Sequence, residues 1–185
     1  MGRRAEALAE VEKSTQIDPS PAWYESAVYF QLRDWPRMVE SGLREVASNP
    51  NDWPAHARLG TGFEGMGKLP EAIAEYQKAS DLSNGDFDTV ASLGHAYAAI
   101  GRRAQAEAML RGLAQKAKDG RASPYFAATI YAGLGNKDKA FQLIEQAYRE
   151  RSFDIASLLK PDLRTDNLRS DPRFQDLLHR TGLPQ

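Results

Sequence analysis

Apolar residues along this chain recur with the three- and four-residue spacing of amphipathic helices, and the pattern returns every 34 residues. The clearest markers are Gly67, Gly101 and Gly135, which stand 34 residues apart. A fixed period of this length predicts a series of stacked supersecondary units. The other positions that keep the phase are Phe63, Tyr97 and Tyr131; Ala72, Ala106 and Ala140; Tyr76, Leu110 and Ile144; and Ala79, Leu113 and Ala147.

The periodic segments predict an all-α fold, because no segment shows the alternation of a half-buried strand. Gly67, Gly101 and Gly135 each follow the last apolar residue of a first helix, where a glycine can adopt the left-handed conformation that ends a helix. The helices are expected at about 3–16, 21–33, 36–48, 53–66, 69–82, 87–100, 103–117, 122–134 and 137–150.

Small residues at equivalent positions predict that the two helices of one unit approach closely. Gly60, Gly94 and Ala128 hold one such position in successive units. Bulky residues in the same phase, such as Tyr76 and Ile144, are then expected to fill the space between successive helix pairs.

The period and residue types resemble the tetratricopeptide repeat, a 34-residue helix–turn–helix unit with the pattern W-x2-L-G-x2-Y…A-x3-F…P. In the unit at 53–86, His56 takes the Trp position and Asn84 the Pro position. The resemblance implies an α-α superhelix, or solenoid, of about four repeats with a preceding half-repeat helix and a C-terminal capping helix. The residues that match are Leu59, Gly60, Phe63, Ala72 and Tyr76.

We expect the repeat array to cover residues 1–154 and a capping segment to cover 155–185. The units are expected at about 2–19 (the second half of a repeat), 19–52, 53–86, 87–120 and 121–154. The register of the second unit has two interpretations. The regular phase places Met38, Gly42 and Glu45 in the core positions, and a slip of one residue places Val39, Leu43 and Val46 there.

A half-repeat at the start leaves an apolar face without a neighbour, because each repeat packs against the next. We therefore expect either that the chain is a fragment of a longer protein or that another chain covers this end. A second copy of the chain would make a homo-oligomer there.

The tail predicts one further helix. Asp171 followed by Pro172 is a typical helix start, and Phe174, Leu177 and Leu178 form one apolar stripe. Gly182 and Pro184 are expected to end it. The tail is similar to those that follow repeat arrays in bacterial signalling proteins, a resemblance that implies an upstream winged-helix, kinase or cyclase domain.

The family resemblance implies a concave groove lined by the first helix of each unit. Its lining is small and neutral with a few aromatic side chains, which suits an apolar helix or an extended peptide. For the aromatic members, packing against neighbouring helices is the alternative, and a solvated side chain is the alternative for Glu64. The candidate partner-binding residues are Trp23, Ala27, Phe30, Ala57, Thr61, Glu64, Ala91, His95, Ala98, Tyr125 and Thr129.

Composition argues against several other classes of protein. The chain has 24 basic and 25 acidic residues among 185, and this balance lacks the basic excess of nucleic-acid and membrane-surface binders. No apolar run reaches the roughly 20 residues of a membrane span, so we expect no membrane insertion. Without cysteine, disulfides and zinc–thiolate sites are excluded.

No catalytic motif accompanies the repeats. The sequence contains no G-x-S-x-G, no H-E-x-x-H and no phosphate-binding glycine loop. His95 has no second ligand in the pattern, and the acidic residues from Asp162 to Asp176 are interleaved with arginines as helix caps and exposed ion pairs would be. We expect no catalytic residues, no metal site and no cofactor.

The sequence thus predicts a non-catalytic interaction scaffold that binds a protein or peptide partner in its groove. A ligand-sensing regulatory domain of a bacterial signalling protein is the alternative, and RNA binding is disfavoured because the inner positions are uncharged. The cytoplasm is the expected compartment, with the periplasm as the alternative. The identity of the partner, the pathway and the oligomeric state stay open.

Overall fold

The computed structural model describes residues 6, 9, 11, 22–117 and 122–182, and the fold in this part of the chain is entirely helical. The predicted all-α class is therefore confirmed. The helix expected at 3–16 and the half-repeat at 2–19 fall largely outside the described residues. Pro184 of the expected helix end also lies outside them.

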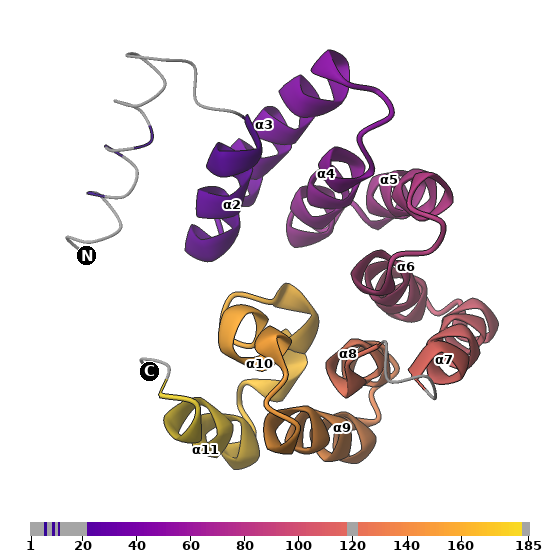
Figure 1. Cartoon of the computed structure of the whole chain (residues 1–185), viewed down its shortest axis with the longest axis vertical. Coiled ribbons are helices and arrows are strands. Elements are labelled where there is room, and N and C mark those ends of the chain that lie inside the picture. Colours follow the sequence, from indigo (N-terminus) through magenta and orange to yellow (C-terminus); the bar gives the residue numbers. More distant parts are fainter. Residues whose placement is uncertain (1–5, 7–8, 10, 12–21, 118–121, 183–185) are drawn as a thin grey trace. The chain divides into compact units, whose positions relative to one another are not determined.

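Eight helices follow the predicted segments, each boundary within two residues of its expected position. Two short elements in the tail, α10 and the 3-10 helix η1, have no counterpart in the prediction. Figure 1 shows the elements in chain order. They are α2 (Ala22–Leu32), α3 (Trp35–Ser48), α4 (Trp53–Gly65), α5 (Leu69–Leu82), α6 (Phe87–Ala99), α7 (Arg103–Ala117), α8 (Pro124–Gly133), α9 (Lys137–Arg149), α10 (Phe153–Leu158), η1 (Leu163–Leu168) and α11 (Pro172–Arg180).

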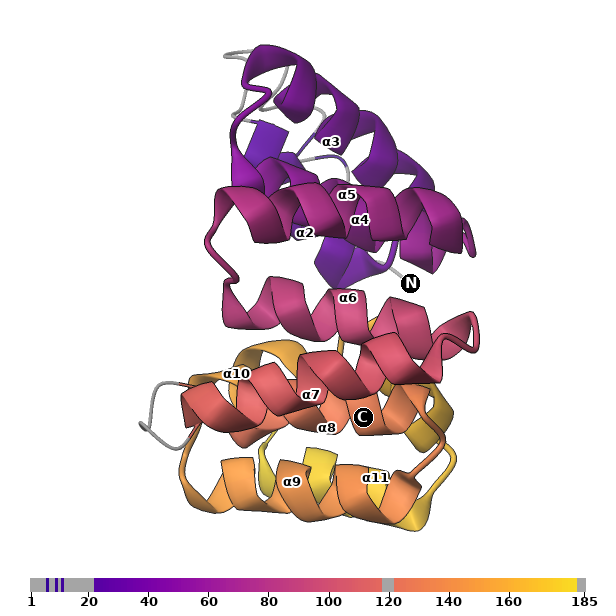
Figure 2. The same ribbon diagram turned by 90° about the vertical axis from the view of Figure 1, so that its right-hand side faces the viewer.

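The chain forms two compact units, residues 1–84 and 85–185. In the first unit, α2 packs against α3, α3 against α4 and α4 against α5. In the second, α6 pairs with α7 and α8 pairs with α9, while α8 also lies against α6, α7 and η1. Figure 2 shows α6, α7, α8 and α9 side by side in the second unit. Each unit is thus built from antiparallel helix hairpins.

Aspartates begin several of these helices and left-handed residues end them. The carboxylates of Asp52 and Asp86 accept hydrogen bonds from the backbone N–H groups of Ala55 and Thr89, at 3.2 and 3.0 Å. The predicted left-handed glycines are confirmed: Gly67, Gly101 and Gly135 have φ of 75°, 77° and 77°.

The regular 34-residue phase extends into α3. Arg33, which stands 34 residues before Gly67, also has a positive φ, 55°. Met38 and Gly42 are buried, as the regular phase requires, whereas Leu43 is 52% exposed. The register slipped by one residue is therefore wrong for this helix.

Close helix approaches depend on glycine. A Cβ added to Gly60 would lie 2.7 Å from the ring of Tyr76, so the absence of a side chain lets α4 lie against α5. A Cβ on Gly94 would lie 2.5 Å from Cδ1 of Ile130, where α6 meets α8. The predicted role, close approach of the two helices of one unit, is confirmed at Gly60, whereas the closest approach at Gly94 is to the first helix of the next unit.

The tail packs onto the second unit through a shared apolar core. Asp171 begins α11 by accepting a hydrogen bond from the backbone N–H of Arg173, as predicted. The stripe of Phe174, Leu177 and Leu178 is buried together with residues of α8 and α9. Leu159, which precedes η1, and Leu168, its last residue, belong to the same core and hold this element in place.

Candidate partner-binding site

The first-helix face of the first unit, formed by the predicted groove residues of α2 and α4, is partly open. Trp23 is 55% exposed and Ala27 is also exposed. Phe30, Ala57 and Thr61 are half-buried. This face therefore combines an accessible indole with small side chains.

A pocket of about 480 Å³ adjoins Trp23 at the ends of α3 and α4. The arginines that line it form ion pairs with acidic residues of the same unit: Arg58 pairs with Glu45, and Arg44 pairs with Glu25. These pairs balance the charges along this part of the wall. The lining residues are Ala22, Trp23, Arg44, Glu45, Ser48, Asn49, Asp52, Pro54 and Arg58.

Glu64, a candidate groove residue for which a solvated side chain was the alternative, is buried. Its carboxylate is buried and accepts a hydrogen bond of 2.8 Å from the hydroxyl of Tyr76 on α5. Thr61 instead bonds its own helix, since its hydroxyl donates to the carbonyl oxygen of Ala57 at 3.0 Å. The alternative that Glu64 is solvated is therefore wrong.

The equivalent face of the second unit, on α6 and α8, is closed. Tyr125, Thr129 and Ala91 are all fully buried, while His95 and Ala98 are partly buried. The expectation that Tyr125 and Thr129 face an open groove is not met, because the chain's own tail lies over them. The alternative given for Tyr125, packing against neighbouring elements, is the one observed.

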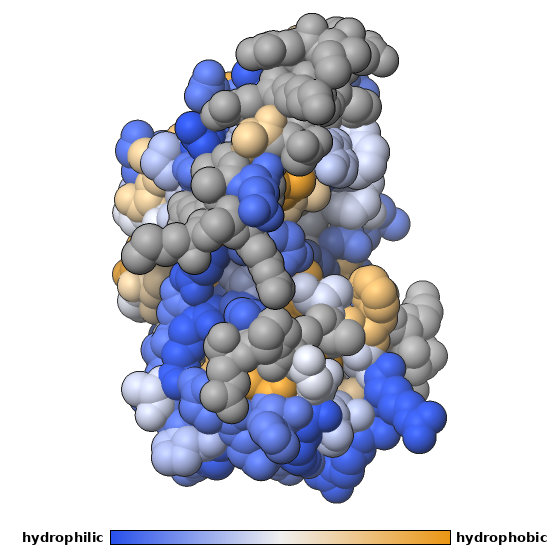
Figure 3. All heavy atoms as spheres, turned by 90° about the vertical axis from the view of Figure 1, so that its left-hand side faces the viewer, coloured by the Kyte–Doolittle hydropathy of each residue, from blue (hydrophilic) through white to orange (hydrophobic). Residues whose placement is uncertain are grey.

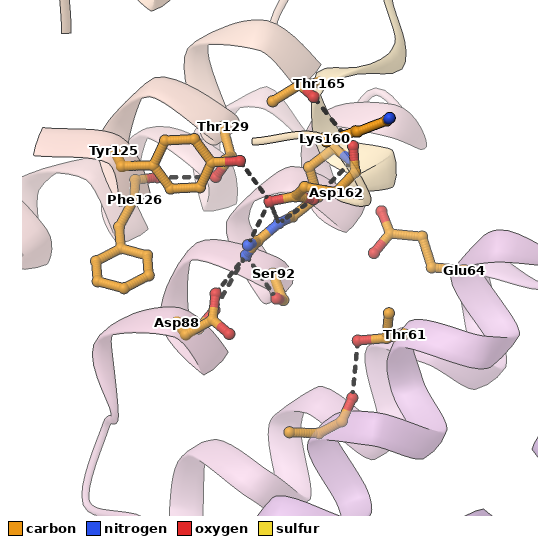
Figure 4. A network of polar contacts seen from close by, with 12 residues as sticks. Thr61, Glu64, Asp88, Ser92, Tyr125, Phe126, Thr129, Lys160, Asp162 and Thr165 are labelled. Carbon is orange, nitrogen blue, oxygen red and sulfur yellow. Dashed lines mark hydrogen bonds and ion pairs between the residues drawn. The ribbon is translucent and has the colours of Figure 1, made fainter. Parts of the chain in front are cut away.

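Arg164 of η1 is the centre of the contact between the tail and this face. Its guanidinium donates to the carboxylate of Asp162 at 2.7 Å and to the hydroxyl of Ser92 on α6 at 2.9 Å, and it lies 2.8 Å from a carboxylate oxygen of Asp88. The hydroxyl of Tyr125 on α8 donates to Asp162 at 2.9 Å. Figure 4 shows Asp88, Ser92, Tyr125 and Asp162 pointing toward one another.

Burial and charge together set the protonation of this cluster. Burial would raise the pKa of Asp162, but the charge and hydrogen bonds of Arg164 outweigh it and lower that pKa below its ordinary value. Burial is also the main reason that the pKa of Tyr125 lies well above the usual range, followed by the charge of Asp162. Asp162 and Arg164 therefore remain an ion pair in the folded protein, and Tyr125 remains a neutral donor.

Asp88, at the edge of the cluster, behaves in the opposite way. Burial raises its pKa more than the charge of Arg164 lowers it, and the neighbouring Asp162 adds to the increase. Arg164 therefore compensates Asp162 more completely than it compensates Asp88.

The sequence predicts helix caps and exposed ion pairs here; Asp162 does cap η1, but the pair that it forms with Arg164 is buried and not exposed. Only the local feature, two opposite charges two residues apart, was visible in the sequence. Their partners Ser92 and Tyr125 lie on helices that are 72 and 37 residues away from them along the chain. No spacing rule connects positions at such distances.

No cluster of three or more potential metal-ligating side chains occurs among the described residues. His56 is buried in the first unit, His95 lies on α6 beside the backbone of Gly133, and His179 is exposed on α11. None of the helices in the described part is both long and apolar enough to cross a membrane.

The face in Figure 3 presents mostly hydrophilic side chains where the described residues are visible, and the hydrophobic ones form small separate groups. Exposed large apolar residues are correspondingly scattered over several helices. They are Trp23, Tyr24, Leu43, Met66, Leu82 and Phe153.

The architecture and the site define a helical-hairpin repeat protein. Comparison with protein families finds that residues 65–129 match the tetratricopeptide repeat. The chain therefore contains a tetratricopeptide-repeat domain, and such repeats generally mediate protein–protein interactions. No curated protein matches the sequence.

Proposed function

We propose that this chain is a non-catalytic interaction module that holds a partner peptide or helix against the first-helix face of its first unit. The observation that carries the proposal is the contrast between two aromatic side chains at predicted groove positions. Trp23, on α2, is more than half exposed. Tyr125, on α8, is buried beneath the tail, where its hydroxyl bonds to Asp162. Within the predicted set, the accessible aromatic anchor thus belongs to the first unit.

The chemistry of this face favours an apolar partner segment. Exposed tryptophans commonly supply a large share of binding energy at protein interfaces, because they bury much apolar area with few rotatable bonds. Ala27 and Ala57 leave room for a partner's side chains beside the indole. The nearby charges of Glu45 and Arg58 pair with each other and would contribute to orientation more than to affinity.

A ligand-sensing domain is a second candidate, and the pocket beside Trp23 favours it. Its volume of about 480 Å³ falls within the range of small-molecule sites. Thermal-shift measurements with a metabolite collection would separate the two functions, because a bound ligand stabilises the folded state by an amount that grows with the logarithm of its concentration over Kd. Stabilisation that is lost in Trp23→Ala would support the sensing function.

The interaction proposal is tested by selecting peptides from a random display library with the full chain and measuring their affinities for variants. We expect Trp23→Ala to weaken the selected peptides at least tenfold while the melting temperature changes little. Phe153→Ala is the matched control, since Phe153 is an aromatic side chain that is 80% exposed on α10. Unchanged affinity in Trp23→Ala, or an equal loss in Phe153→Ala, would contradict the proposed surface.

A further inference from the structure

His56 on α4 is buried, with 1% of its side chain exposed, and both of its ring nitrogens face hydrogen-bond acceptors. Its Nδ1 lies 2.6 Å from Oε2 of Glu75 on α5. Its Nε2 lies 3.0 Å from the carbonyl oxygen of Pro50, in the turn before α4. The imidazole thus connects three consecutive parts of the first unit.

These contacts require one more proton than a neutral histidine and an ionised glutamate hold together. A backbone carbonyl can only accept, so Nε2 must carry a hydrogen to bond Pro50. A neutral imidazole then has a lone pair at Nδ1, which would face the carboxylate of Glu75. A contact of 2.6 Å requires a proton between these atoms, held either as imidazolium and carboxylate or as imidazole and carboxylic acid.

The other charged groups around α4 are engaged elsewhere. Glu45 of α3 and Asp52 of the preceding turn both pair with Arg58 of α4. On α3, Arg44 pairs with Glu25 of α2 and with Glu40, and Arg37 pairs with Asp34. On α5, Glu71, Lys78 and Asp81 are exposed. Glu75, with 24% of its side chain exposed, is therefore the acid that shares the proton with His56 and can exchange it with water.

We propose that His56 and Glu75 form a proton-dependent latch that ties α4 to α5 and to the turn at Pro50. Loss of the shared proton leaves either two acceptors facing each other at Nδ1 or the carbonyl of Pro50 without its donor. Either result is costly at a buried position. Proton release therefore opens the latch.

The direction of the pH effect follows from proton counting. The contacts of the folded latch need one proton more than a neutral histidine and an ionised glutamate hold together. A folded state that binds one more proton than the unfolded chain loses stability as the pH rises. Ala57 and Thr61 lie on the same helix, so an open latch would also disturb the proposed partner surface. That consequence rests on the proposed function, whereas the latch itself does not.

The three tryptophans provide a selective measurement, because Trp23, Trp35 and Trp53 all lie in the first unit. Urea unfolding of the full chain, followed by tryptophan fluorescence between pH 6 and 9, reports this unit. We expect the unfolding equilibrium constant to rise with pH by at most tenfold per pH unit, the limit for one proton.

Glu75→Gln should remove this pH dependence. The glutamine amide can donate to Nδ1 while Nε2–H donates to Pro50, so the variant completes both hydrogen bonds with a neutral ring. Glu71→Gln is the matched control, because Glu71 is an exposed acid one turn earlier on α5. It should keep the pH dependence of the wild type.

Equal unfolding constants at pH 6 and 9 in the wild type, or the same slope in Glu75→Gln, would overturn the latch. Nitrogen-15 NMR of the histidine ring in the full wild-type chain gives a second measurement, which does not depend on the variant's folding. We expect Nε2 of His56 to carry hydrogen at pH 6. An Nε2 without hydrogen at that pH would also overturn the proposal.

Discussion

The guanidinium of Arg164 donates a hydrogen bond of 2.9 Å to the hydroxyl of Ser92, although the two residues stand 72 positions apart in the chain. This contact joins the tail to α6, and Asn167 extends it by donating to the carbonyl oxygen of Ala132 on α8 at 2.7 Å. The tail thus covers the first-helix face of the second unit, whereas the corresponding face of the first unit is partly open.

Arg164→Met should strongly destabilise the second unit. The substitution removes the charge that compensates Asp162 and the donor that satisfies Ser92. Removing one partner of a buried ion pair lowers the free energy of unfolding by about 3–5 kcal/mol. Chemical denaturation followed by far-UV circular dichroism measures the loss. Arg111→Met, at an exposed position of α7, is the control and should behave like the wild type.

Tyr125→Ala and Trp23→Ala should affect stability very differently. Tyr125 is fully buried with its hydroxyl bonded to Asp162, so truncation costs about 3–5 kcal/mol. Trp23 is largely exposed, and its truncation should cost about 1 kcal/mol, near the average for point substitutions. Melting curves of both variants test this. A larger loss for Trp23 would mean that the indole is a core residue.

Gly94→Leu should separate α6 from the helices packed on it. Even a Cβ at this position lies 2.5 Å from Ile130 and 3.1 Å from Met109, so a leucine forces both neighbours to move. Overpacking of this kind costs about 1–3 kcal/mol or more. The control is Gly112→Ala on α7, where a Cβ meets nothing within 4 Å. That variant should gain about 0.5–1 kcal/mol from helix propensity. Thermal unfolding of the two variants should therefore shift in opposite directions.

Acid should loosen α11 from α9. Hydrogen bonds from Arg173 lower the pKa of Asp171 to about 2, and those from Arg180 lower the pKa of Glu145. Carboxylates with lowered pKa values stabilise the folded state above their unfolded values of about 4, and this stabilisation is lost as the pH falls through the folded values. The protection factors of the α11 amides, that is, the exchange rates of an unstructured peptide relative to theirs at the same pH, should therefore fall between about pH 4 and pH 2.

Asp171→Asn separates the charge of this residue from its role at the helix start, because asparagine is an equally good N-cap. The variant should exchange faster than the wild type at pH 5 and differ little from it at pH 2. Equal exchange in the variant and the wild type at pH 5 would mean that the charge of Asp171 does not stabilise α11.

Much of the fold follows from local sequence. The turn at Gly101 needs a residue that tolerates positive φ, and the starts of α4 and α11 need the caps supplied by Asp52 and Asp171. Each of these interactions lies within a few residues, and the repeat of 34 positions shows the glycine turn three times, at Gly67, Gly101 and Gly135, and the aspartate cap twice, at Asp52 and Asp86. η1 has no such signal, because it forms only where Leu168 meets the core of the second unit.

The candidate site was predictable only as a set of helix positions. The sequence by itself determined the helices, their limits and the side of each first helix on which residues such as Trp23 and Tyr125 lie. Tertiary structure decided that the tail covers Tyr125, whose hydroxyl bonds to Asp162, and that the carboxylate of Glu64 accepts a hydrogen bond from Tyr76. The physical reason is that burial depends on which distant segment returns to cover a surface, and that choice depends on packing and charge compensation across the whole unit.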